Sequence, residues 1–167
     1  MLRIDLAALR EGPVAFADQV APDDPLIVAT GLALAGPLGV SGRISSAGDG
    51  KYYWQARLEA VVHSACRRCL TPVDVPVSES LGLVFVTEEQ AQGEEDCYVV
   101  PRRASALDLS GAVREELLLA VPQYVVCRDD CRGLCARCGA DLNAGPCGCA
   151  RETDPRWAAL TKLHRGE

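Results

Sequence analysis

The sequence of 167 residues lacks any apolar run long enough to cross a membrane. A membrane-spanning helix needs about 18 or more consecutive apolar residues, and no run in this sequence reaches that length. The first six residues also include an acidic residue and lack the apolar block of a secretory signal peptide. We therefore expect a cytoplasmic protein that has no membrane partner.

An excess of positive charge is missing as well. The formal net charge is −6, and residues 1–126 hold 17 acidic but only 10 basic residues. A general nucleic-acid-binding protein normally presents a basic face to the phosphates. The acidic balance argues against that class of protein and favours a partner that is itself basic, such as a ribosomal protein.

Catalytic signatures are also absent. The sequence contains no G-x-S-x-G motif, no P-loop, no dinucleotide fingerprint and no pair of acidic residues with a histidine partner. The length and the apolar content of 49% suit one domain, with at most a small appendage, that has a core of its own. We expect a protein that is not an enzyme and has no small-molecule substrate.

Cysteine, in contrast, is abundant, and its densest group lies near the C-terminus. Cys135 and Cys138 have the C-x2-C spacing with which one tight turn can hold a metal ion, and Gly139 supplies the positive φ that such a turn needs. Cys147 and Cys149 complete a set of four. The set predicts a tetrahedral zinc site with a structural role, because four thiolates close the coordination shell; a single iron ion fits the same spacing.

Four further cysteines form two more pairs. Cys66 and Cys69 are spaced C-x2-C, and Cys127 and Cys131 are spaced C-x3-C. Because a tetrahedral ion needs two pairs, the count predicts a second zinc ion held by these four residues. The alternative is a redox dithiol formed by the upstream pair. Cys97 remains over, and we interpret it as a small core residue.

Several arginines lie within or beside these cysteine pairs. Two interpretations are open: the guanidinium groups contact RNA phosphate, or they offset the negative charge of the thiolates. The arginines concerned are Arg67, Arg68, Arg128, Arg132 and Arg137.

Period-2 alternation of apolar residues predicts most of the chain before the helix to be strands. The clearest pattern covers residues 52–65, where Trp54, Leu58 and Val62 share one face. This strand runs directly into Cys66, so we expect the upstream C-x2-C pair at the tip of a β-hairpin. The other predicted strands are a short one near the N-terminus and residues 26–34, 38–46, 73–77, 81–86 and 97–100.

Helical periodicity predicts one main helix over residues 108–120, with Asp108 as its N-cap and Pro122 after its end. Asp154 and Pro155 predict the start of a terminal helix, on which Trp157, Leu160 and His164 share a face. The expected fold is α+β: an antiparallel sheet is packed by the one main helix and followed by a zinc-binding module. We expect a β-rich domain at 1–122 and a cysteine-rich module at 123–167.

Four segments together resemble the bacterial YceD family, described as large ribosomal RNA subunit accumulation protein. They are C-R-R-C-L at residues 66–70, D-L-S-x-x-V-R-E-E-L-L-L-A-V-P at 108–122, the pattern C-x3-C-R-G-L-C-x-x-C-G-x-x-L-N-x-G-P-C-x-C at 127–149, and D-P-R-W-A-A-L-x-K-L at 154–163. The combination is specific, although each segment alone is not.

The resemblance implies a cytoplasmic ribosome-biogenesis factor that supports accumulation or processing of 23S ribosomal RNA. Its implied partner is a precursor of the large ribosomal subunit, through a ribosomal protein, the 23S RNA or both; a small zinc-ribbon protein of that subunit is one candidate. The resemblance also favours the pairing of Cys66 and Cys69 with Cys127 and Cys131, because some relatives keep the upstream knuckle but lack the other set. The alternatives are a zinc-dependent nucleic-acid-binding regulator and a thiol oxidoreductase.

Overall fold

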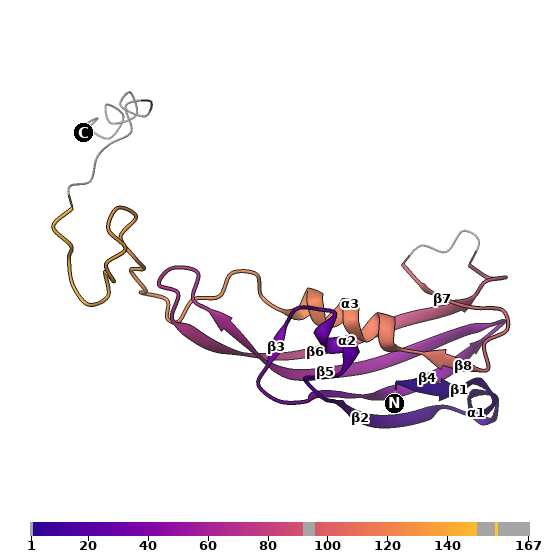
Figure 1. The fold of residues 1–167 in the computed structure, drawn as a ribbon. Helices are drawn as coiled ribbons and strands as arrows, with labels where there is room; N and C mark the ends of the chain where they lie inside the picture. The colour runs from indigo at the N-terminus through magenta and orange to yellow at the C-terminus, as the bar shows by residue number, and fades with distance from the viewer. Residues whose placement is uncertain (1, 92–95, 150–155, 157–167) are drawn as a thin grey trace.

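The computed structural model describes residues 2–91, 96–149 and Arg156 (Figure 1). Strands dominate the described part of the chain, and helices are few. The strands are β1 (Arg3–Asp5), β2 (Val14–Val20), β3 (Ala33–Leu34), β4 (Leu38–Gly48), β5 (Lys51–Ala65), β6 (Pro72–Thr87), β7 (Tyr98–Val100) and β8 (Ala106–Asp108). The helices are α1 (Leu6–Glu11), α2 (Pro25–Val28) and α3 (Ser110–Ala120).

A six-stranded sheet forms the body of the molecule, with strand order β2-β4-β5-β6-β7 and with β3 paired to β5. The long hairpin of β5 and β6 is its centre, and its register runs from Lys51 opposite Val86 to Ala65 opposite Pro72. Most pairs are antiparallel, as the sequence predicts. The exception is β7, which joins β6 in parallel, so the expectation of a wholly antiparallel sheet is wrong at that edge.

The alternation along β5 produces a sheet with one buried and one exposed face. Trp54, Leu58 and Val62 are almost completely buried, and every second residue between them, from Gln55 to Val61, is exposed. Successive side chains of a strand point to opposite faces, so a strict period of two places one set in the core. The predicted strand at residues 52–65 is therefore confirmed, and so is the position of Cys66 at the hairpin tip.

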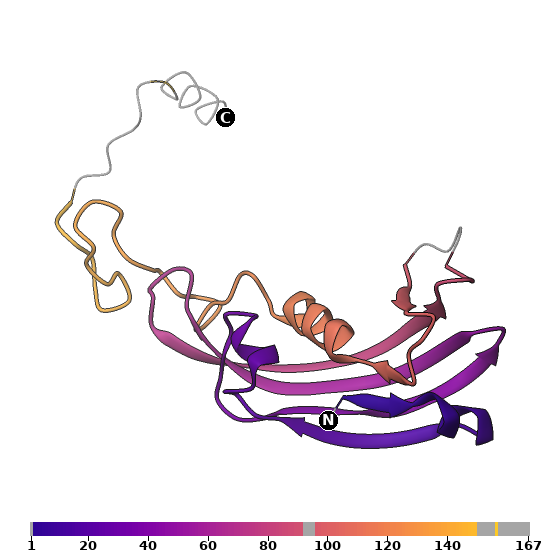
Figure 2. The ribbon, with the colours of Figure 1, turned by 45° about the vertical axis from the view of Figure 1, so that its right-hand side comes forward.

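Several elements contribute buried residues to the core on this face. Helix α3 buries Ala112, Val113 and Leu117, which belong to the same cluster as Trp54 and Leu58. Figure 2 shows α3 lying along one side of the curved sheet. The ribbon of β1 and β8 and the two short helices also contribute, through Leu2, Ile4, Leu9, Ile27 and Leu107.

Residues 26–34 do not form the single strand that their apolar content predicts. They form α2, a turn and the two-residue strand β3. Asp24 caps α2 by accepting a hydrogen bond from the backbone N–H of Leu26, and Pro25 occupies the first turn. This start signal for a helix prevails over the apolar pattern. The sequence interpretation also missed α1, β2 and β8.

The start of α3 lies slightly later than predicted. Asp108 is the last residue of β8, and Leu109 occupies the N-cap position, although the Asp108 carboxylate still accepts a hydrogen bond from the backbone N–H of Ser110. The predicted terminal helix, with Trp157, Leu160 and His164, lies outside the described residues. Within the described ranges, none of the helices has the length and apolar character needed to cross a membrane.

Candidate metal centres

The structure brings the upstream cysteine pair against the pair that follows α3. We call Cys66, Cys69, Cys127 and Cys131 the first tetrad, and their four sulfur atoms all lie within 4.8 Å of one another. The Sγ atoms of Cys66 and Cys131 are 3.8 Å apart, and those of Cys69 and Cys127 are 3.6 Å apart. A tetrahedral zinc ion with Zn–S bonds of about 2.3 Å would place its sulfurs about 3.8 Å apart. The four thiols therefore fit a four-thiolate metal site.

Cys135, Cys138, Cys147 and Cys149 form what we call the second tetrad, and their sulfurs also lie within 4.8 Å of one another. All nine cysteines of the chain are free of disulfide bonds. The predicted grouping of eight cysteines into two sets of four is thus the grouping that the structure has. Cys97, the ninth, is half-buried just before β7 and does not belong to the buried core, so the interpretation as a small core residue is wrong.

The two tetrads differ in their exposure to solvent. In the first tetrad Cys66 and Cys131 are buried, whereas in the second tetrad none of the four is buried. The first tetrad lies where the β5–β6 hairpin tip meets the segment that leaves α3, as Figure 1 shows at the end of the sheet. The second tetrad is built almost entirely from turns beyond this point.

Each tetrad begins with a knuckle, and the two knuckles share one backbone frame. In the first knuckle the N–H of Cys66 donates to the carbonyl of Thr71, and the N–H of Leu70 donates back to the carbonyl of Cys66. In the second knuckle Cys135 and Ala140 make the first of these bonds, and Gly139 donates back to Cys135. All four distances lie between 2.8 and 2.9 Å. The C-x2-C spacing therefore encodes the same turn twice.

The residue after the second cysteine has a positive φ in both knuckles. Gly139 has φ 73°, as predicted, and Leu70 has φ 62°. This left-handed conformation is natural for glycine, but it costs a residue with a Cβ atom roughly 1–2 kcal/mol. The side chain of Leu70 is also 64% exposed, so the first knuckle contains both local strain and an exposed apolar group.

The knuckles direct backbone N–H groups toward the first cysteine of each. Burial opposes ionisation of Cys66, but the N–H groups of Cys69, Cys127 and Arg68 outweigh it and lower the pKa of this thiol to about 6. The N–H groups of Cys138 and Arg137 lower the pKa of Cys135 to about 6. Hydrogen bonds to sulfur favour the thiolate, which is the form that binds metal.

The last cysteine pair of each tetrad contains a thiol with the opposite shift. Loss of hydration, together with neighbouring cysteines, raises the pKa of Cys127 to about 12. The neighbouring thiols, Cys138 first, raise the pKa of Cys149 to about 12. The neighbouring thiols therefore disfavour the thiolate forms of Cys127 and Cys149. A divalent cation beside them would favour ionisation of both.

The arginines of the first knuckle bond to the neighbouring backbone. Arg67 donates from its N–H to the carbonyl of Val125 at 2.8 Å and from Nε to the carbonyl of Gln123 at 3.1 Å. Arg68 donates from Nη1 to the carbonyls of Asp129 and Cys131, at 3.1 and 2.9 Å. These two guanidinium groups fasten the hairpin tip to the segment after α3.

Asn143 joins the second tetrad's loop to the first tetrad. Its Nδ2 donates to the sulfur of Cys131 at 3.6 Å, and its Oδ1 accepts from the backbone N–H of Arg132 at 2.8 Å and from Nη2 of Arg128 at 2.9 Å. The sequence interpretation did not single out this residue. A signal for it exists, because Asn143 is the only asparagine of the chain and lies between two cysteine pairs.

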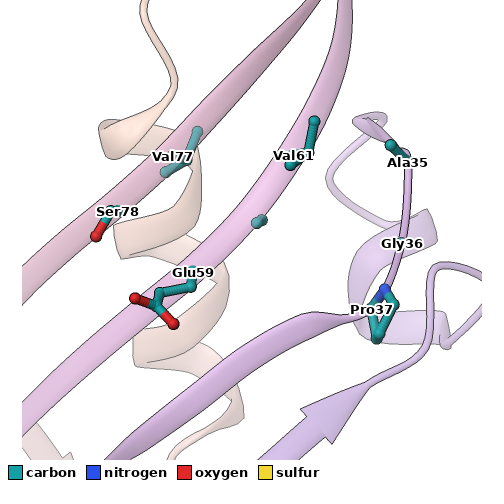
Figure 3. Close-up of a pocket in the computed structure, with 8 residues that line it drawn as sticks. Ala35, Gly36, Pro37, Glu59, Val61, Val77 and Ser78 are labelled. Carbon is teal, nitrogen blue, oxygen red and sulfur yellow. The ribbon is translucent and has the colours of Figure 1, made fainter.

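A shallow pocket on the exposed face of the sheet lies apart from the cysteines (Figure 3). Glu59 and Val61 of β5, Ser78 of β6 and the turn at Gly36 line it, with α3 on the opposite side of the strands. The Glu59 carboxylate accepts a hydrogen bond from Nε of Arg57 at 2.8 Å. The lining of this pocket is mainly apolar. The metal-binding groups of the described residues lie in the two tetrads instead.

In class, this is a mainly β protein that carries two four-cysteine sites, one at a hairpin tip and one in the turns that follow. Residues 54–164 match the family described as Large ribosomal RNA subunit accumulation protein YceD. The match includes all eight tetrad cysteines and more than half of the chain. The chain belongs to this family, as the resemblance in the sequence predicts.

Two mycobacterial relatives match part of the chain. The chain is 35% identical over 103 residues to an uncharacterized protein of Mycobacterium tuberculosis, a match that covers 59% of this chain and 48% of that protein. A similar match, 35% over 109 residues, links it to an uncharacterized protein of Mycobacterium leprae, with 60% of this chain and 47% of that protein covered. The chain thus spans about half the length of these relatives.

A plant protein extends the family beyond bacteria. The chain is 30% identical over 93 residues to the chloroplastic Large ribosomal RNA subunit accumulation protein YCED homolog 1 of Arabidopsis thaliana. That match covers 48% of this chain and 29% of the plant protein. No solved structure matches the chain.

Proposed function

We propose that the two tetrads bind two structural zinc ions, each held by four cysteine thiolates. The supporting observation is the gathering of four sulfurs within 4.8 Å in each tetrad, with two spacings of 3.6 and 3.8 Å that suit a tetrahedral ion. Zinc is the ion that four thiolates on turns most commonly hold in structural sites. A zinc ion bound by four thiolates would have no open coordination position for catalysis. It would instead form a rigid link between chain segments.

Metal content tests this part of the proposal. Protein purified without chelators and analysed by native mass spectrometry should carry two zinc ions per chain, and so should the control variant Cys97→Ser. A content near one, with Cys66 and Cys69 freely alkylated, would contradict the first site. Iron in place of zinc would contradict the choice of metal but not the ligands.

The proposed role of the protein is that of a non-enzymatic factor for assembly of the large ribosomal subunit. It supports accumulation or processing of 23S ribosomal RNA in the cytoplasm. The observation that carries this proposal is membership of a family named for large ribosomal RNA subunit accumulation. In a strain that lacks the protein, we expect less mature 23S RNA relative to 16S RNA, and restoration by the intact chain but not by Cys66→Ser.

The direct partner that we propose is a basic ribosomal protein of the subunit precursor, in preference to bare 23S RNA. Residues 1–126 carry 17 acidic and 10 basic side chains. Three of the arginines beside the cysteines have partners within the chain: Arg67 and Arg68 bond to backbone carbonyls, and Arg128 pairs with Asp130 and Asn143. These bonds favour a structural role over contact with phosphate.

A binding experiment separates the two partner classes. The purified, zinc-loaded protein is offered immobilised large-subunit proteins and, separately, 23S RNA fragments over a range of salt. We expect saturable binding to a basic protein at physiological ionic strength and only weak binding to RNA. Tight RNA binding that falls steeply with salt, without protein binding, would instead support the nucleic-acid-binding alternative.

The division of the chain follows from the same proposal. Residues 1–122 would act as the sheet domain, and residues 123–167 as a module that the first zinc ion fixes at the hairpin tip. The N–H of Leu134 donates to the carbonyl of Arg68 at 2.9 Å, and this bond supports a defined docking position. Limited proteolysis after removal of zinc should release a stable fragment that ends near residue 122.

A further inference from the structure

Asn143 uses its full hydrogen-bonding capacity to connect the two tetrads. Its Nδ2 donates one hydrogen to Oδ1 of Asp141 at 2.7 Å and the other to the sulfur of Cys131 at 3.6 Å. Its Oδ1 accepts from the N–H of Arg132 and from Arg128. An amide side chain has two donor hydrogens and two acceptor sites, so the amide is fully satisfied and its orientation is fixed.

The position of Asn143 in the chain depends on the second tetrad. The residue lies in the loop between Cys138 and Cys147, both of which are ligands of that tetrad. Within the loop, the Asp141 carboxylate also accepts a hydrogen bond from the backbone N–H of Asn143 at 2.9 Å. A metal ion in the second tetrad would therefore hold both ends of the loop that presents the amide to Cys131.

The effect of Asn143 falls on a ligand of the first tetrad. An N–H group that donates to a metal-bound thiolate disperses its charge and fixes its direction, and loss of such an outer partner typically lowers metal affinity 10- to 100-fold. Another link between the two regions is the backbone bond from Leu134 to Arg68. Among the links between the second tetrad's loop and the first tetrad in the described residues, the Asn143 bond is the one that reaches a sulfur.

We propose that Asn143 is a positioning residue that couples the two sites, so that metal in the second tetrad raises the metal affinity of the first. This inference rests on the two-zinc part of the proposed function and goes beyond it. Because coupling of binding free energies is reciprocal, metal in the first tetrad raises the affinity of the second by the same factor. The protein then loads both ions together instead of holding one alone.

The test measures the affinity of each site separately in the full-length chain. Two cadmium-113 ions give separate NMR signals, which single-site variants assign, and competition with a chelator gives the affinity of each site. The variants are Asn143→Asp, which keeps the acceptor toward Arg132 but cannot donate to sulfur, and Cys147→Ser with Cys149→Ser, which removes the second site. Ala144→Ser, in the same loop, is the control.

We expect first-site affinity to fall 10- to 100-fold in Asn143→Asp and in the double serine variant, while Ala144→Ser changes it less than about 3-fold. Combined, the two changes should cost little more than either alone, since both remove the same bond. The Trp54 signals report folding in every variant, and Asn143→Ala provides a second substitution with the same expectation.

The outcomes separate this inference from the proposal on which it rests. If the wild-type protein binds fewer than two ions, the two-zinc proposal and the coupling both fail. If it binds two ions and Asn143→Asp leaves first-site affinity unchanged, the coupling alone is overturned. Full additivity of the two changes would also overturn it, because Asn143 would then act independently of the second site.

Discussion

The two knuckles have the same turn but connect very different lengths of chain. The first knuckle finds its other two ligands far along the sequence, since Cys69 and Cys127 are 58 residues apart. The second knuckle, Cys135 and Cys138, is completed by cysteines within the same short segment. A crosslink that closes a long loop restricts the unfolded chain more than one that closes a short loop. The same turn therefore joins distant segments of the chain in the first tetrad, whereas in the second tetrad it joins only neighbouring turns.

The comparison predicts the largest effect for Cys66→Ser. The buried sulfur of Cys66 belongs to the long-range site, and three thiolates do not complete a structural zinc shell. We expect first-site affinity to fall by more than about 100-fold, above the loss typical for an outer partner. Hydrogen exchange should accelerate in the residues after Pro122 and remain slow around Trp54.

Two outcomes of that experiment would contradict the comparison. Loss of protection throughout β5 would make the first ion part of the core, and unchanged protection would mean that Cys66 binds no metal. Cys97→Ser is the matched control, because Cys97 is a half-buried cysteine outside both tetrads.

Cys147→Ser should have a smaller and more local effect. The second tetrad is built from turns and has no buried cysteine. We expect loss of one ion and faster hydrogen exchange over residues 133–149, with the sheet unaffected and the first ion held 10- to 100-fold more weakly through Asn143. Faster exchange that extended into α3 would show that the second site also supports the sheet domain.

Gly133→Ala tests the contact between the two regions. Gly133 has φ 73°, and a Cβ atom there would lie 2.7 Å from the carbonyl oxygen of Arg68. Gly139 has the same φ, but a Cβ atom at that position would meet no other atom within 4 Å, so Gly139→Ala isolates the backbone strain. We expect each substitution to cost roughly 1–2 kcal/mol for strain, and Gly133→Ala to cost more because of the clash. Chemical denaturation of the zinc-loaded variants measures the loss of unfolding free energy for each substitution. Equal losses would show that Gly133 does not lie close to the Arg68 carbonyl.

Leu70→Gly should stabilise the first knuckle, in contrast to the two substitutions of glycine by alanine. Leu70 has the left-handed conformation that glycine provides in the second knuckle, and its side chain is 64% exposed. Relief of strain should outweigh the entropy cost of glycine, and we expect about 0.5–1 kcal/mol of added stability. A lower denaturation midpoint in the variant would show that the Leu70 side chain makes stabilising contacts.

The smallest predicted difference concerns pH, to which both tetrads should respond alike. Cys66 and Cys135 have pKa values near 6, so they are thiolates at neutral pH, whereas Cys127 and Cys149, with pKa values near 12, must release protons when metal binds. The metal affinity of both sites should therefore rise with pH. It should fall more steeply as the pH drops through about 6, where Cys66 and Cys135 become protonated. Chelator competition between about pH 5 and pH 8 should give parallel curves for the two sites; curves that diverge would contradict the shared frame.

Local patterns allowed much of the site to be predicted from the sequence. The C-x2-C spacing and the alternation along β5 depend on neighbouring residues, so they placed Cys66 at a hairpin tip and grouped eight cysteines correctly. One miss was local, because the Asp24 cap and Pro25 start helix α2 where the apolar pattern predicted a strand. Other features depend on contacts between distant segments. The parallel pairing of β7 and the hydrogen bond from Asn143 to Cys131 follow from the folded arrangement, and no local periodicity encodes them.

The long sequence separation between the two cysteine pairs of the first tetrad also determines when its metal site can form during synthesis. A ribosome adds roughly 5–20 residues per second, so the 58 residues between Cys69 and Cys127 take about 3–12 s to make. Throughout that interval the first knuckle has only two of its four ligands. The hairpin of β5 and β6 is complete well before its metal site can close, and the nascent chain carries an open dithiol at the hairpin tip until α3 has been made.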